Sequence, residues 1–444
     1  MSTADPSVSE APPLSPRLNA QLSLMMFLQY AIWGAWLPFL WSFLSSHRGM
    51  SGEKIGTMFS AGAVGAIIGP FIAGQIADRY FSTQKFLGIS HLIGAVLIWF
   101  LATIDSYAGF LTFSLLYGLV YAPTLSLTNS LAFHHLPDRD RDFGKVRLWG
   151  TFGWIAVGIA MGQWLAAMHS PSNLEGEALL AAQNAGKADC FRLSSILGAI
   201  LGVYCFTLPN TPPSREGKSN ASFEAMSEVK RQPLLMLFLL AVPMSCVHQF
   251  YFVHTEGFLS AKQLDAPGWM QTIFGVGGGG LMTVGQMTEV LVLGMIPFVS
   301  KKFSRKWLLA AGLVAYALRM LLFAYVDAIP LPSMLTLMLG VALHGFCFGC
   351  FIFVAFMVVD EETTTDVRAS AQSLFNLVIV GIGIIVGSPI AGKIHTWATT
   401  DGVTDYTKLF SIPMYIAIAC LALLLFAYPN GSKEKASLTE GGGA

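Results

Sequence analysis

Apolar stretches alternate along this chain with short polar breaks. Windows such as "LGISHLIGAVLIWFLATI" and "FSIPMYIAIACLALLLFAY" are free of Asp, Glu, Lys and Arg over about the length that crosses a bilayer. Backbone groups in lipid must be satisfied internally, so such segments are helices or strands of a closed barrel. The runs are about twice as long as a barrel strand and do not alternate strictly. The pattern therefore predicts an all-α polytopic membrane protein.

The pattern resolves into twelve predicted transmembrane helices. They cover residues 22–46, 53–77, 85–103, 106–133, 145–168, 191–209, 233–260, 270–299, 306–326, 332–359, 367–396 and 408–428. The polar stretch "PNTPPSREGKSNASFEAMSEVKRQP" divides them into six and six. A weak repeat supports this division, because "ADRYFSTQKFL" after the second span is similar to "VSKKFSRKWLL" after the eighth. Two such halves are typical of transporters that bind a solute between them.

The division predicts five regions along the chain. They are a disordered cytoplasmic N-terminus (1–20), an N-terminal six-helix half (21–209), a cytoplasmic linker (210–232), a C-terminal six-helix half (233–428) and a cytoplasmic tail (429–444).

Basic residues are distributed unevenly between the two sides of the predicted bundle. One side receives Arg17, Arg79, Lys85, Arg139, Arg141, Lys145, Arg215, Lys218, Lys230, Arg231, Lys301, Lys302, Arg305, Lys306, Arg368, Lys433 and Lys435. The other side receives Arg48, Lys54, Lys187, Arg192, Lys262, Lys393 and Lys408. Because basic loops stay in the cytoplasm, both termini are expected there.

Composition agrees with this class and argues against others. Hydrophobic residues make up 54% of the chain and charged residues 12%, where a soluble domain has about 25% charged. The net charge of zero gives no sign of a nucleic-acid partner. The segment after Arg17 is too long for the apolar core of a secretory signal. Cys347 and Cys350 lie in an apolar span without other ligand residues, which favours packing over metal or redox chemistry.

Motifs for nucleotide chemistry are incomplete. "GVGGGG" follows no predicted strand, and "GSPIAGKI" ends in Ile394 where a phosphate loop has Ser or Thr. The sequence also lacks a clear catalytic triad. We therefore expect no enzyme activity, no cofactor and no metal site.

A carboxylate lies inside the eighth predicted span, "GVGGGGLMTVGQMTEVLVLGMIPF". Glu289 is about 16 Å from Ser300 along a helix, which places it near the bilayer centre. Gln286 lies one turn earlier on the same face. Ionisable groups in a membrane are costly and mark functional sites by default, although a protonated Glu can also bond to a neighbouring helix.

Other spans carry polar and aromatic residues at helical spacing. In the fifth span Arg147, Thr151 and Trp154 share a face, and Arg147 is either a cavity residue or an interfacial anchor. The seventh span carries Gln249 and Phe252, with His248, His254 and Glu256 approaching the outer side. The tenth carries His344 and Phe348, whereas Arg319 of the ninth has no evident partner. Amides, hydroxyls and flat rings suit an uncharged, hydroxylated or heteroaromatic solute.

Several motifs carry a family resemblance. "GQIADRYFSTQK" resembles the major facilitator loop motif in relaxed form. "FLQYAIWGAWLPFL", "YAPTLSLTNSL", "VRLWGTFGW", "GQMTEVL", "LRMLLFAY" and "VRASAQSLF" resemble segments of bacterial nucleoside:proton symporters of that superfamily. The similarity extends over about residues 20 to 428. It implies a major facilitator fold and nucleoside uptake coupled to protons.

The resemblance also implies a binding site. Its substrate residues would be Arg147, Thr151, Trp154, Gln249, Phe252, Gln286, Glu289, His344 and Phe348, with Glu289 and His344 also serving proton coupling. The chain departs from the family at four of its positions. This chain has Trp154 where the relatives have a Phe and His344 where they have a Tyr. It has Phe252 in place of an Asn and Gly349 in place of an Asp. One intramembrane carboxylate is therefore missing, so that Glu289 couples protons by itself or with His344, or the substrate differs.

The expected function is proton-coupled import of nucleosides by rocking of two halves. Asp78 and Arg79, in the loop after the second span, are expected to gate the outward-facing state. The expected partners are a nucleoside, protons and the lipid bilayer, with the protein a monomer in the bacterial inner membrane. A sugar or modified nucleoside as the solute, and a membrane sensor without transport, remain alternatives.

Overall fold

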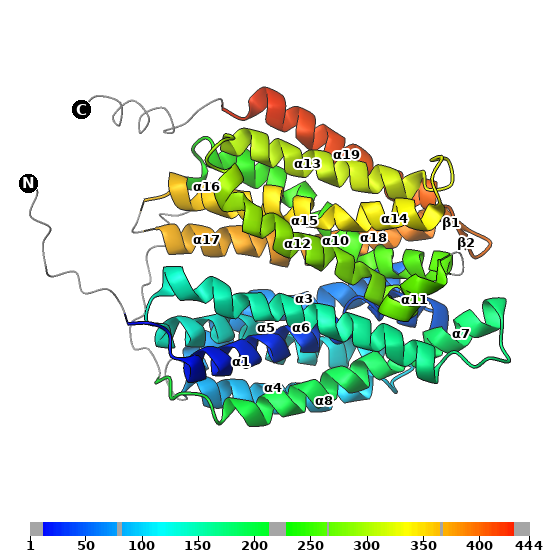
Figure 1. Ribbon diagram of the computed structural model, residues 1–444, viewed down its shortest axis with the longest axis horizontal. Helices are drawn as coiled ribbons and strands as arrows, with labels where there is room; N and C mark the ends of the chain where they lie inside the picture. The colour runs from blue at the N-terminus through cyan, green and yellow to red at the C-terminus, as the bar shows by residue number, and fades with distance from the viewer. Residues whose placement is uncertain (1–11, 78–81, 213–227, 264–265, 365–366, 430–444) are drawn as a thin grey trace, which may run out of the picture.

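The fold is an almost entirely helical bundle. The computed structural model describes residues 12–77, 82–212, 228–263, 266–364 and 367–429. Its long helices lie roughly along one axis in two groups, one formed by the first half of the chain and one by the second (Figure 1). We call the end where α1 begins and α19 ends the terminal end, and the other the opposite end.

The first group contains the helices before the polar linker. Its elements are α1 (Pro16–Trp36), α2 (Leu40–Ser42), the π-helical η1 (Phe43–His47), α3 (Gly52–Ala77), α4 (Thr83–Leu101), α5 (Tyr107–His135), α6 (Arg139–Met168), α7 (Gly176–Gly186) and α8 (Ala188–Cys205). Helix α1 packs on α6 and α8, α3 packs on α5, and α4 packs on α5 and α8.

The second group follows the linker. Its elements are α10 (Leu234–Lys262), α11 (Gly268–Phe274), α12 (Gly279–Val299), α13 (Arg305–Ala324), α14 (Ser333–Ala342), α15 (His344–Phe346), the π-helical η3 (Cys347–Phe353), α16 (Val354–Glu362), α17 (Arg368–Asn376), the π-helical η4 (Leu377–Ile382), α18 (Gly383–Ala398), β1 (Thr399–Thr400), β2 (Val403–Thr404) and α19 (Tyr406–Ala427). The two strands form an antiparallel hairpin, and α13 packs on α19 while α10 packs on α18.

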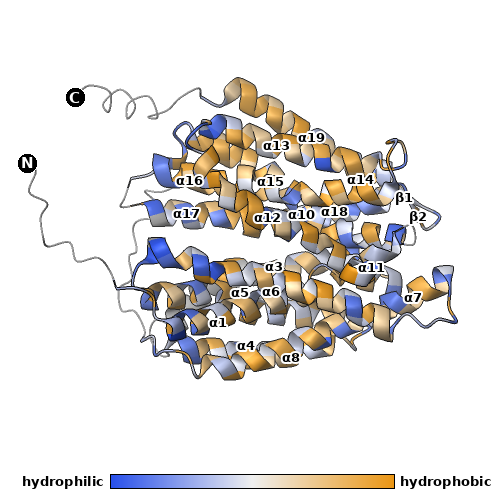
Figure 2. Cartoon of the chain, viewed as in Figure 1, coloured by the Kyte–Doolittle hydropathy of each residue, from blue (hydrophilic) through white to orange (hydrophobic). Residues whose placement is uncertain are grey.

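The helices have the length and surface of membrane spans. Among the described residues, 11 helical segments are long and apolar enough to cross a bilayer, and α3, with 26 residues, supplies the twelfth predicted span. Large apolar side chains face outward, as at Phe298 and Phe426, which are 70% and 91% exposed. Apolar residues cover the sides of the bundle and polar residues gather toward its two ends (Figure 2). The predicted all-α polytopic membrane fold is confirmed.

Two predicted boundaries need correction. Helix α1 begins at Pro16, not at residue 22, because the Ser15 hydroxyl caps it by accepting a hydrogen bond from the Leu18 amide and proline suits the first turn. The predicted disordered region 1–20 therefore overlaps the start of α1. The eighth span is not continuous from residue 270. Gly275 and Gly277 have φ values of +71° and +88°, so the chain breaks between α11 and α12.

The sixth span is also longer than predicted. The sequence places it at 191–209, but α8 begins at Ala188 and α7 extends the helical segment back to Gly176. Lys187 therefore lies at the junction of two helices and is fully buried. The loop residues Asp78 and Arg79, which we expected to gate transport, lie outside the described residues.

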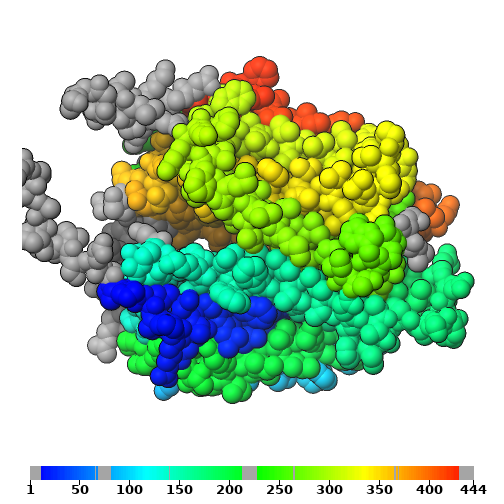
Figure 3. All heavy atoms as spheres, viewed as in Figure 1, coloured from blue at the N-terminus to red at the C-terminus, as the bar shows by residue number. Residues whose placement is uncertain are grey.

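The two groups of helices pack closely at the opposite end. A Cβ atom added to Gly52 of α3 would lie 2.6 Å from the carbonyl oxygen of Gly392 in α18. The Val276 amide before α12 donates a 3.0 Å hydrogen bond to the carbonyl of Gly162 in α6. Figure 3 shows α11 lying against α6 near this end and a hollow between the groups nearer the terminal end. The opposite end of the bundle is therefore closed.

Candidate functional site

Glu289 lies at the middle of α12, ten residues from either end of the helix. Its side chain is 15% exposed, and its Oε2 faces Nε2 of His344 at 3.5 Å. His344 begins α15, in the broken tenth span, and is 1% exposed. The structure thus brings together the two residues that the sequence assigned to proton coupling, on neighbouring helices of the second group.

Glycines make this close approach possible. A Cβ atom added to Gly345 would lie 2.4 Å from the backbone of Thr288, and one added to Gly285 would lie 3.0 Å from Cβ of His344. The Thr288 hydroxyl donates a 2.7 Å hydrogen bond to the Ala342 carbonyl across the same contact. Small residues at these positions therefore let α12 carry its carboxylate up to the histidine.

Aromatic rings join the two groups of helices beside this pair. The ring of Trp154 on α6 lies 6.2 Å from that of Phe252 on α10, at an interplanar angle of 74°. Trp33 of α1 meets Trp154 edge-on at 5.5 Å, and Phe252 meets His344 at 5.7 Å. Side chains from both halves of the chain therefore converge on one aromatic junction, near the middle of the bundle.

Arg147 and Thr151 continue the α6 face toward the terminal end. The guanidinium carbon of Arg147 lies 3.9 Å from the centroid of the Tyr30 ring, a cation–π contact with α1. Thr151 is partly buried one turn further along α6. This face presents a cation, a hydroxyl and, at Trp154, an aromatic ring.

The two glutamines differ in their partners. Nε2 of Gln249 donates a 3.0 Å hydrogen bond to the Ser388 hydroxyl of α18, and both side chains are buried. Gln286, one turn before Glu289, is 6% exposed, and its Oε1 atom has no hydrogen-bond partner within the described chain. A buried acceptor without a donor is costly, so the Oε1 atom of Gln286 is available to accept a hydrogen bond from a ligand.

Several neighbours of the site escaped the sequence reasoning. We expected His248 to approach the outer side, but its ring stacks on His344 at 5.5 Å and lies 6.4 Å from Phe348. The ring of Tyr251 also stacks on that of His344, with the two ring centroids 4.9 Å apart. The spacing of four residues between His248 and Phe252 could have signalled a shared face.

Gly349, where the family resemblance places an aspartate, has its space filled by a neighbour. A Cβ atom added there would lie 2.6 Å from Cγ1 of Val292, on the turn of α12 after Glu289. Val292 is 6% exposed. Close apolar packing of η3 on α12 therefore occupies the place of a second carboxylate.

A buried ion pair joins the two groups near the opposite end. Nζ of Lys187 lies 2.8 Å from Oε1 of Glu256 on α10, and it donates a 2.8 Å hydrogen bond to the Ser42 hydroxyl of α2. That hydroxyl in turn donates to the Glu256 carboxylate. From the sequence we had assigned Lys187 to the sparsely charged side of the bundle and had predicted no partner for it.

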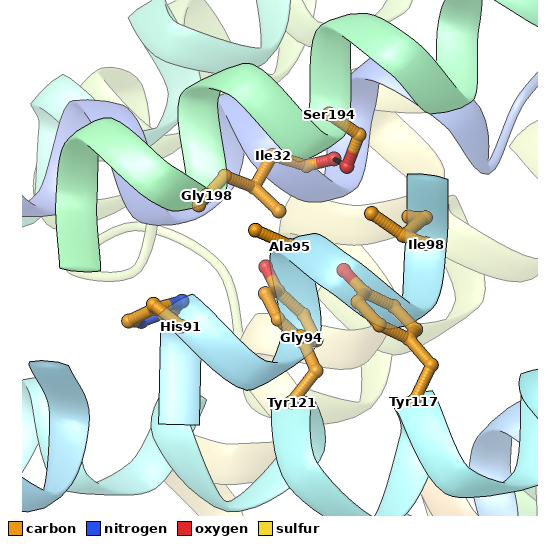
Figure 4. Close-up of a pocket in the computed structure, with 9 residues that line it drawn as sticks. All are labelled: Ile32, His91, Gly94, Ala95, Ile98, Tyr117, Tyr121, Ser194 and Gly198. Atoms are coloured by element: carbon orange, nitrogen blue, oxygen red, sulfur yellow. Dashed lines mark hydrogen bonds between the residues drawn. The ribbon is translucent and has the colours of Figure 1, made fainter. Parts of the chain in front are cut away.

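Two other spaces lie away from this aromatic junction. One lies inside the first group, and its lining, drawn in Figure 4, is Ile32, His91, Gly94, Ala95, Ile98, Tyr117, Tyr121, Ser194 and Gly198. It is too narrow to hold a water molecule. The other is an open hollow of about 290 Å³ at the terminal end of the second group, lined by Phe353, Phe356, Met357, Asp360, Glu361 and Gln372.

Two groups of membrane-spanning helices that meet at a polar, aromatic site define a secondary transporter, not an enzyme. The family comparison is more specific. Residues 17–431 match the family described as nucleoside H⁺ symporters, and the chain belongs to that family.

Curated relatives and solved structures agree with this assignment. The putative nucleoside transporter YegT of Escherichia coli K12 is 34% identical over 385 residues, which cover 85% of this chain and 84% of that protein. The nucleoside permease NupG of the same organism is 27% identical over 433 residues, covering 94% and 99%. A crystal structure of a NupG mutant superposes with a TM-score of 0.79 at 25% identity, covering 92% of this chain and 99% of that one.

A more distant structure shows the same fold. A bacterial homologue of the human lysosomal transporter Spinster, in an inward-facing conformation, superposes with a TM-score of 0.70 at 14% identity. At this identity the likeness supports the fold alone. The predicted major facilitator fold and the predicted family are both confirmed.

Proposed function

We propose that this protein imports nucleosides by proton symport, through alternating access of a central site. The observation that carries the proposal is the position of Glu289, at the middle of a membrane helix, facing His344 beside an aromatic junction of the two halves. Membership of the nucleoside H⁺ symporter family and similarity to a nucleoside permease support it.

The site residues divide the recognition of a nucleoside between them. Trp154, Phe252 and Phe348 offer ring faces and edges to the planar base. Arg147, Thr151, Gln249 and Gln286 offer donors and acceptors to the hydroxyls and to the polar edge of the base. The Oε1 atom of Gln286, which has no hydrogen-bond partner among the described residues, can accept a hydrogen bond from a ligand.

Proton coupling follows from the cost of a charge in the membrane. When Glu289 takes a proton from the outer side it becomes neutral, and the charge no longer has to be stabilised as the site closes. His344 lies beside the carboxylate, with Nε2 3.5 Å from Oε2. Release of the proton on the other side restores the charge and resets the carrier, so the proton and the nucleoside move together.

The proposal includes the orientation of the protein. The uneven distribution of basic residues supports a cytoplasmic location for both termini, and we propose that the membrane is the bacterial inner membrane. The closed opposite end is then the outer side, and the hollow toward the terminal end faces inward. Asp78 and Arg79 would act in the reverse, outward-facing state. We further propose a monomer with two six-helix halves, the first beginning with α1 at Pro16, that are joined by the linker 210–232 and followed by the tail 429–444.

Counterflow in proteoliposomes tests the proposed function. Vesicles loaded with unlabelled uridine or adenosine should take up the labelled nucleoside, with saturable kinetics and competition between nucleosides. Exchange of a sugar such as maltose, without exchange of nucleosides, would overturn the proposed substrate class. Nucleoside binding without flux under any proton gradient would identify a sensor instead of a carrier.

A further inference from the structure

Arg319 is a buried cation next to the proposed proton site. It lies on α13 with none of its side chain exposed. Its guanidinium carbon lies 4.2 Å from the centroid of the Tyr251 ring and 5.0 Å from that of Tyr316. Nη1 lies 3.1 Å from Nδ1 of His344, whereas Nε and Nη2 have no hydrogen-bond partner within the described chain. A charged side chain in the membrane interior is energetically costly and usually has a functional role.

The contact between Arg319 and His344 determines which nitrogen of the imidazole ring carries a hydrogen atom. A guanidinium group only donates hydrogen bonds and keeps its charge in proteins. Nδ1 of His344 must therefore accept the hydrogen bond and carry no hydrogen. The neutral ring then has its hydrogen on Nε2, and this atom faces Oε2 of Glu289 at 3.5 Å. The histidine thus points a donor at the carboxylate.

The surroundings of His344 oppose a doubly protonated ring. Such a ring would direct an Nδ1 hydrogen at the donor of Arg319 and place two positive charges 3.1 Å apart in a buried place. The other titratable groups facing the ring are His248 and Tyr251 of α10, whose rings stack on it, and Glu289 of α12. Glu289 supplies an attraction for a histidine charge, but this attraction disappears when Glu289 itself takes the proton.

His248, which stacks on His344, has a tyrosine hydroxyl as its partner, and this group can donate or accept a hydrogen bond. Its Nδ1 lies 2.7 Å from the Tyr316 hydroxyl of α13, and its ring lies nearly parallel to that of His344, at 27°. A charge on His248 would be repelled by the same guanidinium, since Arg319 also contacts Tyr316. The two histidine rings therefore stack on one another beside Tyr316 and Arg319.

We propose that Arg319 is a positioning residue that holds His344 as a neutral Nε2–H donor, so that Glu289 is the group that carries the transported proton. This inference rests on the proposed function and deepens it by dividing the coupling role between the two residues. His344 orients and stabilises the carboxylate, and its ring does not itself shuttle the proton.

Nitrogen-15 NMR of histidine in the purified protein tests the assignment without transport. The chain has nine histidines, and the His344 signals are those missing from the spectrum of His344→Gln. We expect Nδ1 without hydrogen and Nε2 with hydrogen across the range in which free histidine titrates, about pH 5 to 8. Protonation of Nδ1 within that range would overturn the proposal.

Uptake measurements provide the second test. In Arg319→Met the histidine becomes free to titrate, so the pH profile of nucleoside uptake should gain a histidine-like step. The double variant Arg319→Met/His344→Gln should lose that step, because the glutamine amide keeps a donor near the Nε2 position but cannot take a proton. His344→Gln should lower the uptake rate while the ratio of uptake with and without a proton gradient is kept. Loss of that ratio would contradict the proposal.

The two tests separate this inference from the proposed function. If the purified protein exchanges no nucleoside while the NMR signals show the Nε2–H form, the proposed function fails and the role of Arg319 in setting the ring stands. If exchange is coupled to protons but Nδ1 titrates, the function stands and the role of Arg319 fails. Should Arg319→Met not fold, Arg319→Lys keeps the cation and shortens the donor, and it should show a weaker form of the same pH step.

Discussion

The ammonium of Lys187 lies 2.8 Å from the carboxylate of Glu256, and neither side chain has any exposed surface, although they belong to different halves of the chain. The hydroxyls of Ser42 and Ser260 lie within hydrogen-bond distance of the ammonium, at 2.8 Å and 3.4 Å. If one partner of a buried ion pair is removed, the other charge is left buried without compensation, and the folded protein is strongly destabilised. This pair therefore helps to hold the opposite end of the bundle closed.

Separating the pair should weaken that closure. Removal of one partner of a buried ion pair costs about 3–5 kcal/mol, because the other charge is left unpaired. Lys187→Met and Glu256→Gln should each lower the melting temperature in detergent and slow nucleoside exchange, and the double variant should lose less than the sum of the two. Lys262→Met, which breaks an ion pair with the exposed Asp327, is the control and should cost at most about 1 kcal/mol. Strictly additive losses would show that Lys187 and Glu256 are not coupled.

The two glutamines should respond differently to substitution. Gln286→Leu removes an acceptor that has no partner in the part of the chain that the structure describes, so stability should be kept. Nucleoside binding should weaken about tenfold to a hundredfold, which corresponds to one hydrogen bond to a buried group. Gln249→Leu also leaves the buried Ser388 hydroxyl without its partner, so it should lower both affinity and melting temperature. Calorimetric binding and thermal unfolding distinguish the two. Equal melting losses with unchanged affinity at Gln286 would contradict its assignment to the substrate.

The ring of Trp154 should contribute to the affinity for nucleosides. It contacts Trp33 and Phe252 edge-on, which leaves it at the junction of the two halves. Stacking of a base on an aromatic side chain is worth about 1–3 kcal/mol, so Trp154→Ala should weaken nucleoside binding about fivefold to a hundredfold. Trp154→Phe keeps a ring face and should lose much less. Quenching of tryptophan fluorescence by nucleosides should also fall in both variants, and wild-type affinity in Trp154→Ala would exclude stacking at this ring.

The fold could be predicted from the sequence because the length of an apolar run is a local property. Glu289, Gln286 and Trp154 could be nominated for a similar reason, since a carboxylate, an amide or a ring in a membrane span stands out whatever surrounds it. Boundaries were less predictable where local chemistry competes with hydropathy. The cap at Ser15 lengthens α1, and the left-handed glycines before Gly279 shorten α12.

Partners between helices could not be predicted, because they depend on how each helix is rotated against its neighbours. Arg319 stood out as a charge, but His344 as its partner emerges only when α13 and α15 are packed together. Lys187 looked like a loop residue because its charge interrupts the apolar run, and Glu256, which neutralises it, lies far along the chain. His248 was assigned to the outer side by position, whereas tertiary packing stacks it on His344.

The close contact between Gly349 and Val292 predicts a coupled effect. Gly349→Ala places a methyl group 2.6 Å from Cγ1 of Val292, and overpacking of this kind costs about 1–3 kcal/mol. Val292→Ala alone removes buried methyl groups and should also destabilise the protein. The double variant should be more stable than the sum of the single losses predicts, because the new methyl group fills the space that valine leaves. Thermal unfolding of the four proteins measures this, and additive losses would mean that the two positions do not compete for the same space.

Accumulation of labelled uridine in proteoliposomes with an acidic exterior tests the central claim most directly. The wild-type protein should concentrate uridine above its equilibrium level while the proton gradient lasts. Glu289→Gln, which keeps the size of the side chain but cannot exchange a proton, should still allow some counterflow but no accumulation. Glu177→Gln, at an exposed position of α7, should behave as wild type. Accumulation by Glu289→Gln at the wild-type level would contradict the account, because the carboxylate at the middle of α12 would then not couple the proton to the nucleoside.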